Sequence, residues 1–343
     1  MKKSLLALAV LGAFAGAATA QSNVTIYGSF DGGVRHQTNT NAAGDSRLTM
    51  GSNGTYNSNR IGFKGVEDLG GGLNAHFTLE TGFNTGTGTL DNANNRLFNR
   101  TASVGLGGAW GALDLGRQYS VNYLTIALYD PFQYKYTGII PLATQGGINR
   151  LDNDIKYTGK FGGVGVSAEY APGEVAGSTG NNATEAIGLN YSGGPFVVGA
   201  AYTTGKRAGS ALAGAPLDQT MKNWTVGGTY ATGPFRVALG YADFKQDLTA
   251  GGQQRTKDWW LGGSYQLTPA AALSVAYYQT TGISGTNTVA LTNDDKRKLF
   301  IVGATYALSK RTNFYADIDN ARYNNAANSP NQTGVSIGIN HLF

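Results

Sequence analysis

The sequence predicts an all-β protein, a sixteen-stranded antiparallel up-and-down β-barrel, and three observations carry that prediction. Apolar and polar residues alternate along most of the chain, which is the period of a strand with two different faces. Short connections rich in Gly, Pro, Ser or Lys alternate with long polar ones, as expected when one barrel rim is plain and the other decorated. Gly is abundant (51 residues), Tyr follows (19) and Pro is scarce (8), which suits bent, closely packed strands.

Residues 1–20 are expected to be a cleaved secretory signal peptide and not part of the fold. Lys2 and Lys3 precede an apolar run, and the run ends in small residues at Ala18 and Ala20, as at an A-x-A cleavage site. The domain that follows is therefore expected to span residues 21–343. A retained membrane anchor is the alternative, but the run is short for a membrane span. The absence of cysteine excludes disulfides and thiolate metal sites.

The strands can be placed in order by their alternation. In the first strand Val24, Ile26, Phe30 and Val34 share one face, and polar residues occupy the other. The remaining fifteen strands are expected at residues 60–64, 73–79, 101–106, 113–116, 154–157, 164–170, 186–191, 196–202, 224–230, 235–241, 259–267, 273–278, 300–308, 314–318 and 334–343. An even number of strands is self-consistent for a closed barrel with both termini on the short-turn rim.

One long connection, residues 118–150, lacks clean alternation. Loops of this length in a compact fold are usually functional or disordered. It carries six Tyr and Phe residues between positions 119 and 136, too many for a disordered linker. We therefore expect an ordered loop that folds into the barrel interior. A surface loop with a short helix around residues 123–129 is the alternative.

The polar faces of the strands indicate which side meets water. They include Asp31, Arg35, Lys64, Glu80 and Lys156. A barrel of sixteen strands is too wide for its side chains to fill, so the polar face should line water and the apolar face should meet lipid. Tyrosines near the strand ends fit the headgroup level of a membrane. Two packed β-sandwich domains are the soluble alternative.

Several segments resemble one family along the whole mature chain. They are NVTIYGSFDGGV, RIGFKGVEDLGGGLNAHFTLE, VGLGGAWGALDLGRQYS, NDIKYTGKFGG, YALSKRTNFYA and the terminal GINHLF. The chain thus resembles the Gram-negative general porins of the β-proteobacterial and neisserial type. The resemblance implies a cell outer-membrane homotrimer, with contacts from the first and last strands and from the second loop, roughly residues 82–98.

The resemblance also implies roles for single residues. The loop after the fifth strand, here residues 118–150, should narrow the pore. Phe343 resembles the terminal aromatic residue of the outer-membrane insertion signal. Asn340 departs from the family, which often has an arginine at that place, so no role is carried over to it.

The expected function is passive diffusion of ions and small hydrophilic solutes through a water-filled channel, with weak to moderate anion preference. Arg and Lys along a pore favour anions, whereas Asp and Glu favour cations. The basic candidates at the constriction are Arg150 first, then Arg35, Arg60, Lys64, Lys156 and Arg236, with Arg100 and Arg117 ranked lower because they share parity with apolar neighbours. The acidic candidates are Asp130 on the loop and Asp31, Glu80, Asp152 and Asp154 on the wall.

Other functions are less well supported. A solute-specific outer-membrane channel for small anions or sugars is the alternative, because the same barrel serves both uses. His36, His76 and His341 are isolated in the sequence, so we expect no catalytic site, metal site or cofactor. No basic run is dense enough to indicate a nucleic-acid partner. An adhesin would need repeats or charge blocks in its loops, and none is present.

Overall fold

The computed structural model of the chain describes residues 23–41, 43–51, 54–92, 94–136, 149–207, 219–247, 253–282, 296–324 and 331–343. The expected signal peptide, residues 1–20, lies outside the described residues, as does the second part of the long central loop, residues 137–148. No helix in the described part of the chain is long and apolar enough to cross a membrane.

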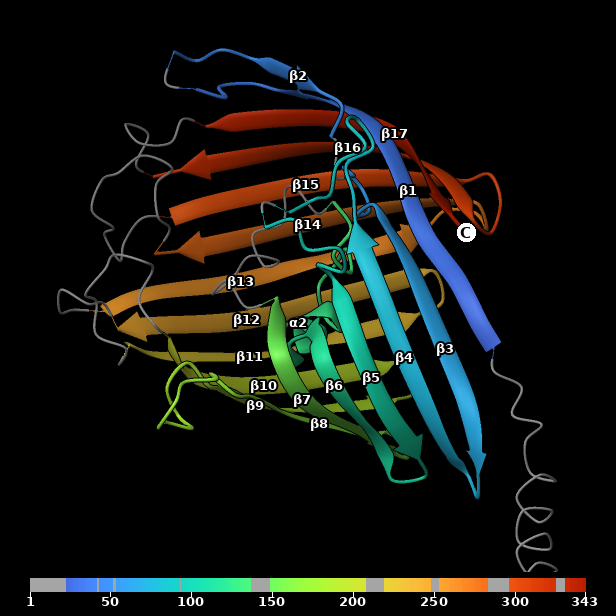
Figure 1. The fold of residues 1–343 in the computed structure, drawn as a ribbon. Helices are drawn as coiled ribbons and strands as arrows, with labels where there is room; N and C mark the ends of the chain where they lie inside the picture. The colour runs from blue at the N-terminus through green and yellow to red at the C-terminus, as the bar shows by residue number, and fades with distance from the viewer. Residues whose placement is uncertain are drawn as a thin grey trace, which may run out of the picture.

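The described chain forms one antiparallel sheet that closes on itself, with one short helix inside it (Figure 1). The elements are β1 (Asn23–Gln37), β2 (Arg47–Thr49), β3 (Arg60–Gly70), β4 (Leu73–Gly82), β5 (Thr101–Gly108), β6 (Gly111–Tyr119), α2 (Val121–Ala127), β7 (Arg150–Phe161), β8 (Val164–Ala171), β9 (Thr184–Gly193), β10 (Phe196–Arg207), β11 (Gln219–Thr232), β12 (Phe235–Asp247), β13 (Gln253–Gln266), β14 (Ala271–Thr281), β15 (Lys296–Ala307), β16 (Thr312–Tyr323) and β17 (Gln332–Leu342).

Sixteen of these strands make the barrel wall, which confirms the predicted fold class. β2 is an extra three-residue strand that pairs with the end of β1, inside the stretch that the sequence suggested was loop only. The sequence also placed residues 67–72 in a turn, but β3 runs on to Gly70 and only Gly71 and Gly72 separate it from β4. This turn is tighter than predicted because consecutive glycines adopt positive φ, which glycine tolerates without strain.

The wall closes where β1 changes partner. β1 pairs with β3 from Asn23 to Ser29, and with β17 from Ser29 to Gln37. The C-terminal Phe343 exchanges backbone hydrogen bonds with Gly28 (3.1 and 3.3 Å), and its ring lies 5.7 Å from that of Phe30. The terminal residue therefore seals the seam between the first and last strands, and no backbone edge is left for hydrocarbon to cover there.

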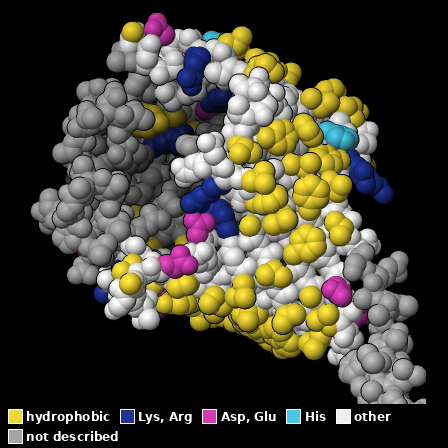
Figure 2. Space-filling view, in the orientation of Figure 1, with side chains coloured by type: hydrophobic (Ala, Val, Ile, Leu, Met, Phe, Trp, Pro, Cys, Tyr) yellow, Lys and Arg dark blue, Asp and Glu magenta, His cyan; other side chains and the backbone are white. Residues whose placement is uncertain are grey.

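The two faces of each strand differ as the alternation predicts. On β17, Ile337 and Ile339 are 64% and 42% exposed, whereas Ser336 and Asn340 on the other face are 1% and 2% exposed. Asn340 donates hydrogen bonds to Ser29 Oγ (2.9 Å) and to the Phe30 carbonyl oxygen (3.1 Å). In the space-filling view hydrophobic side chains cover the outer wall, and charged side chains lie mainly along its margins (Figure 2). The apolar face thus points outward and the polar face inward.

Aromatic residues form a belt at each end of the outer wall. Near the short connections, Phe235 lies against Tyr265 with ring centroids 4.6 Å apart, and Phe196 against Tyr230 at 4.9 Å. Near the long loops, ring pairs at 5.1 Å join Trp224 to Tyr241 and Trp259 to Tyr277. Amphipathic rings at two levels are the pattern found at the two interfaces of a membrane.

Inward-facing glycines on β11, β12 and β15 make room for the central loop. A Cβ on Gly227 would lie 2.3 Å from the Tyr129 ring, and one on Gly240 would lie 2.2 Å from the Trp260 ring. A Cβ on Gly303 would lie 2.1 Å from the Tyr136 hydroxyl. These three glycines, which we call the glycine track, leave space for the aromatic side chains that pack against them.

Gly227→Ala should therefore loosen the loop from the wall. The added methyl group has no space, and overpacking of this kind costs about 1–3 kcal/mol. The measurement is the free energy of unfolding of the refolded barrel in lipid vesicles, by urea titration. Gly32→Ala is the matched control, because a Cβ at Gly32 meets nothing within 4 Å. Equal stability of the two variants would contradict the glycine track.

Candidate pore constriction

The central loop enters the lumen directly after β6. The hydroxyl of Ser120 caps α2 by accepting the Tyr123 backbone N–H at 3.2 Å. Val121 and Ile126 are buried on the side of the helix that packs against β8–β11, whereas Leu124 on the other side is 42% exposed. The described part of the loop therefore lies inside the barrel and against one wall, which confirms the predicted inward fold.

Aromatic side chains fix the loop after α2. Tyr129 is fully buried, its hydroxyl hydrogen-bonds Thr225 Oγ1 at 2.8 Å, and its carbonyl oxygen accepts Trp260 Nε1 at 2.9 Å. The rings of Tyr129 and Trp260 stack with centroids 5.8 Å apart. The loop is thus attached to β11 through Thr225 and to β13 through Trp260.

Asp130 is an anchor of the loop and does not line the open pore, so the prediction for this residue is wrong. It is 0% exposed and accepts hydrogen bonds from Tyr278 Oη (2.6 Å) and from the Tyr134 backbone N–H (2.8 Å). Burial raises the pKa of the Asp130 carboxyl to about 6 despite these hydrogen bonds. Arg236 lies with it, donating to the carbonyl oxygens of Asp130 (3.2 Å) and Pro131 (2.9 Å).

The end of the first loop holds the central loop at Tyr136. Asp31, also fully buried, accepts hydrogen bonds from Tyr315 Oη (2.8 Å) and from the backbone N–H of Thr55 (2.9 Å). Next to them the Tyr56 ring stacks on Tyr315 at 5.1 Å, and the Tyr56 carbonyl oxygen accepts the Tyr136 backbone N–H at 2.7 Å. Asp31 therefore acts in the structure as an anchor, like Asp130.

The opposite wall carries a cluster of charges around one carboxylate. Glu80 on β4 accepts hydrogen bonds from Arg100 Nε (2.6 Å) and from Tyr27 Oη (2.9 Å). Arg60 Nε lies 3.7 Å from the same carboxylate. The side chain of Arg100 therefore points inward, although its parity suggested the lipid face, because it precedes the first paired residue of β5.

Tyr119 continues this cluster toward β7. Its hydroxyl accepts Arg100 Nη2 at 2.6 Å and Arg150 Nη2 at 2.7 Å. The hydrogen-bonded chain Tyr27, Glu80, Arg100, Tyr119 and Arg150, which we call the wall belt, thus crosses from β1 to β7. Among the described residues no carboxylate lies within 4.0 Å of Arg150.

Two lysines add positive charge to the same space. Lys64 is exposed, with Nζ 5.5 Å from the Tyr27 ring. Lys135 on the loop has Nζ 5.4 Å from the Tyr56 ring, and burial, with a smaller contribution from Arg60, lowers its pKa to about 8. Neither lysine has a carboxylate partner within 4.0 Å in the described part of the chain.

The other predicted basic residues, Arg35 and Lys156, lie next to carboxylates. Arg35 pairs with Asp319 (2.7 Å) and Asp317 (3.7 Å) on β16. Lys156 is 5% exposed, and its Nζ donates to the Tyr119 carbonyl oxygen at 2.6 Å and lies 4.0 Å from the fully buried Asp154. Both pairs place opposite charges together, so their net contribution to the field in the pore is small.

Asp152 does not share the inward parity of Asp154, which corrects the alternation argument. Between the pairs Gly116–Asp154 and Gln118–Leu151, β7 has two residues where β6 has one, and Asn153 adopts a φ of 56°, so a β-bulge intervenes. The Asp152 side chain is 47% exposed and forms ion pairs with Arg96 (3.1 Å) and with Arg117. Arg117 lies two residues beyond the outward-facing Leu115.

The sequence did not single out Tyr119 or Lys135 as site residues. Tyr119 was counted only among the aromatic residues of the loop. The residues next to it in the sequence do not indicate which side chains it contacts in the fold. The burial of Asp130 is what makes Lys135 the one charged side chain of residues 118–136 that is not fully buried.

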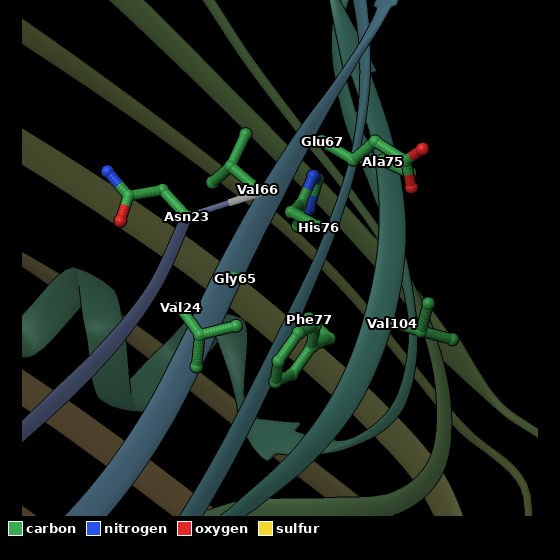
Figure 3. A pocket seen from close by; sticks show the side chains of 9 residues that line it. All are labelled: Asn23, Val24, Gly65, Val66, Glu67, Ala75, His76, Phe77 and Val104. Atoms are coloured by element: carbon green, nitrogen blue, oxygen red, sulfur yellow. The ribbon is translucent and has the colours of Figure 1, made fainter. Parts of the chain in front are cut away.

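A cavity of about 240 Å³ on the outer wall is separate from this space (Figure 3). It arises at Gly65, between the side chains of Val24, Phe77 and Val104, with Glu67 at one end. Its lining is mostly apolar and belongs to the outward face of β1, β3, β4 and β5. No group of three or more His, Asp or Glu side chains in the described residues could hold a metal ion.

A closed barrel with an aqueous, loop-narrowed lumen and an apolar, aromatic-belted exterior defines an outer-membrane channel. The chain belongs to the Gram-negative porin family, because the sequence model of that family matches residues 7–326. It is 32% identical to an outer membrane porin protein of Bordetella pertussis and 33% identical to outer membrane porin protein 32 of Delftia acidovorans, each over 100% of both chains.

Solved structures show the same fold. The anion-selective porin from Comamonas acidovorans superposes with a TM-score of 0.77 and 27% identity, covering 94% of this chain and 100% of that one. The trimer form of OmpT from Vibrio cholerae gives a TM-score of 0.69 at 17% identity, covering 94% of this chain and 99% of that one. The second likeness shows the fold alone.

The attachment of the loop should depend on pH through Asp130. A carboxyl whose pKa rises from its ordinary 3.8 to about 6 on folding stabilises the folded state fully below 3.8, and this stability is lost as pH rises through 6. The free energy of unfolding of the wild type should therefore fall by up to about 3 kcal/mol between pH 4 and pH 7 relative to Asp130→Asn.

Urea titrations in lipid vesicles at four pH values measure this difference. Asp45→Asn, at an exposed position of the first loop, is the matched control and should keep the wild-type pH dependence. Parallel curves for the wild type and Asp130→Asn would show that the buried carboxyl does not control the loop.

Proposed function

We propose that this chain is a general diffusion porin of the outer membrane that prefers small anions to cations. The proposal is supported by the excess of basic over acidic side chains around the constriction, on the central loop and on the wall that faces it. Among the described residues, Glu80 is the one carboxylate within 4.0 Å of Arg60, Lys64, Lys135 or Arg150. A positive field across the narrowest part of a water-filled channel favours anions.

The central loop supports this reading. Residues 118–149 contain only two charged residues, Asp130 and Lys135, and Asp130 is buried with Arg236 beside it. The loop therefore brings no exposed acid to face the basic wall. The likeness to a porin described as anion-selective, at 27% identity, agrees with the proposal.

The stacked tyrosines give little support to a sugar-specific channel. Sugars bind to free aromatic faces, but Tyr123 stacks on both Tyr119 (4.8 Å) and Tyr134 (4.2 Å), and Arg150 Cζ lies 4.2 Å from the Tyr119 ring centroid. Hydrogen-bonded and stacked rings of this kind rigidify the constriction. A channel specific for small anions remains the second candidate, because Arg150 has no acidic partner among the described residues.

We also propose the assembly and processing of the chain. The exposed apolar faces of β1 and β17 offer a surface for a homotrimer, and the rest of the outer wall would meet lipid. A Vibrio cholerae protein of the same fold is described in a trimer form. The mature chain would begin at Gln21, and Phe343, at the seam of the barrel, would serve as the insertion signal.

The reversal potential of the refolded channel in a planar bilayer, across a tenfold KCl gradient, tests the proposed function. The wild type should prefer chloride to potassium, and Arg150→Gln should lower the permeability ratio by about twofold. Arg311→Gln, on an exposed short turn, is the matched control and should leave the ratio unchanged. A potassium preference of the wild type would sink the proposal.

The anion preference should also fall as pH rises above 8. Because the pKa of Lys135 is lowered to about 8, its ammonium is charged below that pH and neutral above it. The chloride-to-potassium ratio should be smaller at pH 9 than at pH 7, and Lys135→Gln should abolish this step. The same step in the variant would assign it to another group.

A further inference from the structure

Tyr119 has a backbone that is fixed on both sides. It is the last residue of β6 and precedes Ser120, the cap of α2. Its carbonyl oxygen accepts Lys156 Nζ at 2.6 Å, and the Ser120 N–H donates to the Asn149 carbonyl oxygen at 3.0 Å. The direction in which the Tyr119 side chain leaves the wall is therefore set by the wall and by both ends of the central loop.

The ring of Tyr119 contacts both an aromatic ring and a guanidinium. The Tyr123 ring stacks on it with an interplanar angle of 11°, and Arg150 Cζ lies 4.2 Å from its centroid. A cation over the face of a tyrosine ring is attracted by the ring quadrupole. The Tyr119 hydroxyl accepts one hydrogen bond from Arg100 and one from Arg150.

We propose that Tyr119 is a specificity-determining residue that acts by positioning Arg150 in the pore. This inference rests on the proposed anion preference. The physical reason is that the phenol side chain of Tyr119 is neutral. It accepts hydrogen bonds from two N–H groups and contacts a guanidinium with its ring, but it adds no negative charge. Arg150 is thereby held in place with its full charge available to a passing anion.

Other basic residues of the lumen show the contrast. Arg35 is held by Asp317 and Asp319, which offset its charge. Arg100 reaches the same hydroxyl as Arg150, but Glu80 neutralises it, so the approach of the two guanidinium groups costs little. Arg150, by contrast, is anchored by a neutral hydroxyl and has no carboxylate within 4.0 Å among the described residues. Without an anchor, a long arginine side chain would populate several rotamers.

The test is Tyr119→Phe, which keeps the ring and removes only the hydroxyl. The chloride-to-potassium permeability ratio, from the reversal potential in a tenfold KCl gradient, should fall by about twofold although no charge has changed. Tyr123→Phe is the matched control, because the described structure shows no hydrogen bond of its hydroxyl and its ring belongs to the same stack. It should leave the ratio unchanged.

A double-variant comparison separates positioning from a general structural effect. If Tyr119 acts through Arg150, then Tyr119→Phe should change nothing further in an Arg150→Gln background. An unchanged ratio in Tyr119→Phe, an equal loss in Tyr123→Phe, or an equal further loss in the Arg150→Gln background would each overturn the inference. A wild type without anion preference would instead refute the proposed function, which the same recordings show separately.

Discussion

The requirement that every backbone group crossing hydrocarbon find a partner governs this molecule. A β-strand satisfies it only through its neighbours, so the sheet must close, and β1 closes it by pairing with β3 along one half and with β17 along the other. A wall of sixteen strands leaves a lumen that its own side chains do not fill. The inward glycines then leave room for the aromatic side chains of the central loop, which narrows that lumen from one side.

The charge of the pore depends on where carboxylates are used more than on how many there are. The sequence has 26 basic and 21 acidic residues, a modest excess. Asp31 and Asp130 are buried, where each attaches a loop to the wall through tyrosine hydroxyls and backbone N–H groups. Arg150 instead rests on the neutral Tyr119. Asp31 and Asp130 are thereby withdrawn from the water, whereas Lys64 is exposed and Lys135 is not fully buried.

The sequence was sufficient for the fold and for only part of the site. Alternation and connection lengths predicted the strand count and the faces, because these follow from local periodicity. The length and aromatic content of residues 118–150, together with the family resemblance, predicted the inward loop. Parity failed at Asp152, where a β-bulge shifts the register of β7, and at Arg100, which lies just outside its strand. It also could not show that Asp130 is buried, since that depends on Tyr278, 148 residues away in the chain.

The central claim is that the constriction is electropositive, and the absence of cysteine from the sequence allows a direct measurement. Single cysteines would replace the exposed Gln133 on the loop and, for reference, the exposed Thr232 at the end of β11, next to a short turn. Rates of modification by an anionic and by a cationic thiosulfonate reagent of similar size would be compared at both sites. Our account predicts a higher anionic-to-cationic rate ratio at Gln133→Cys than at Thr232→Cys. An equal or lower ratio would contradict it.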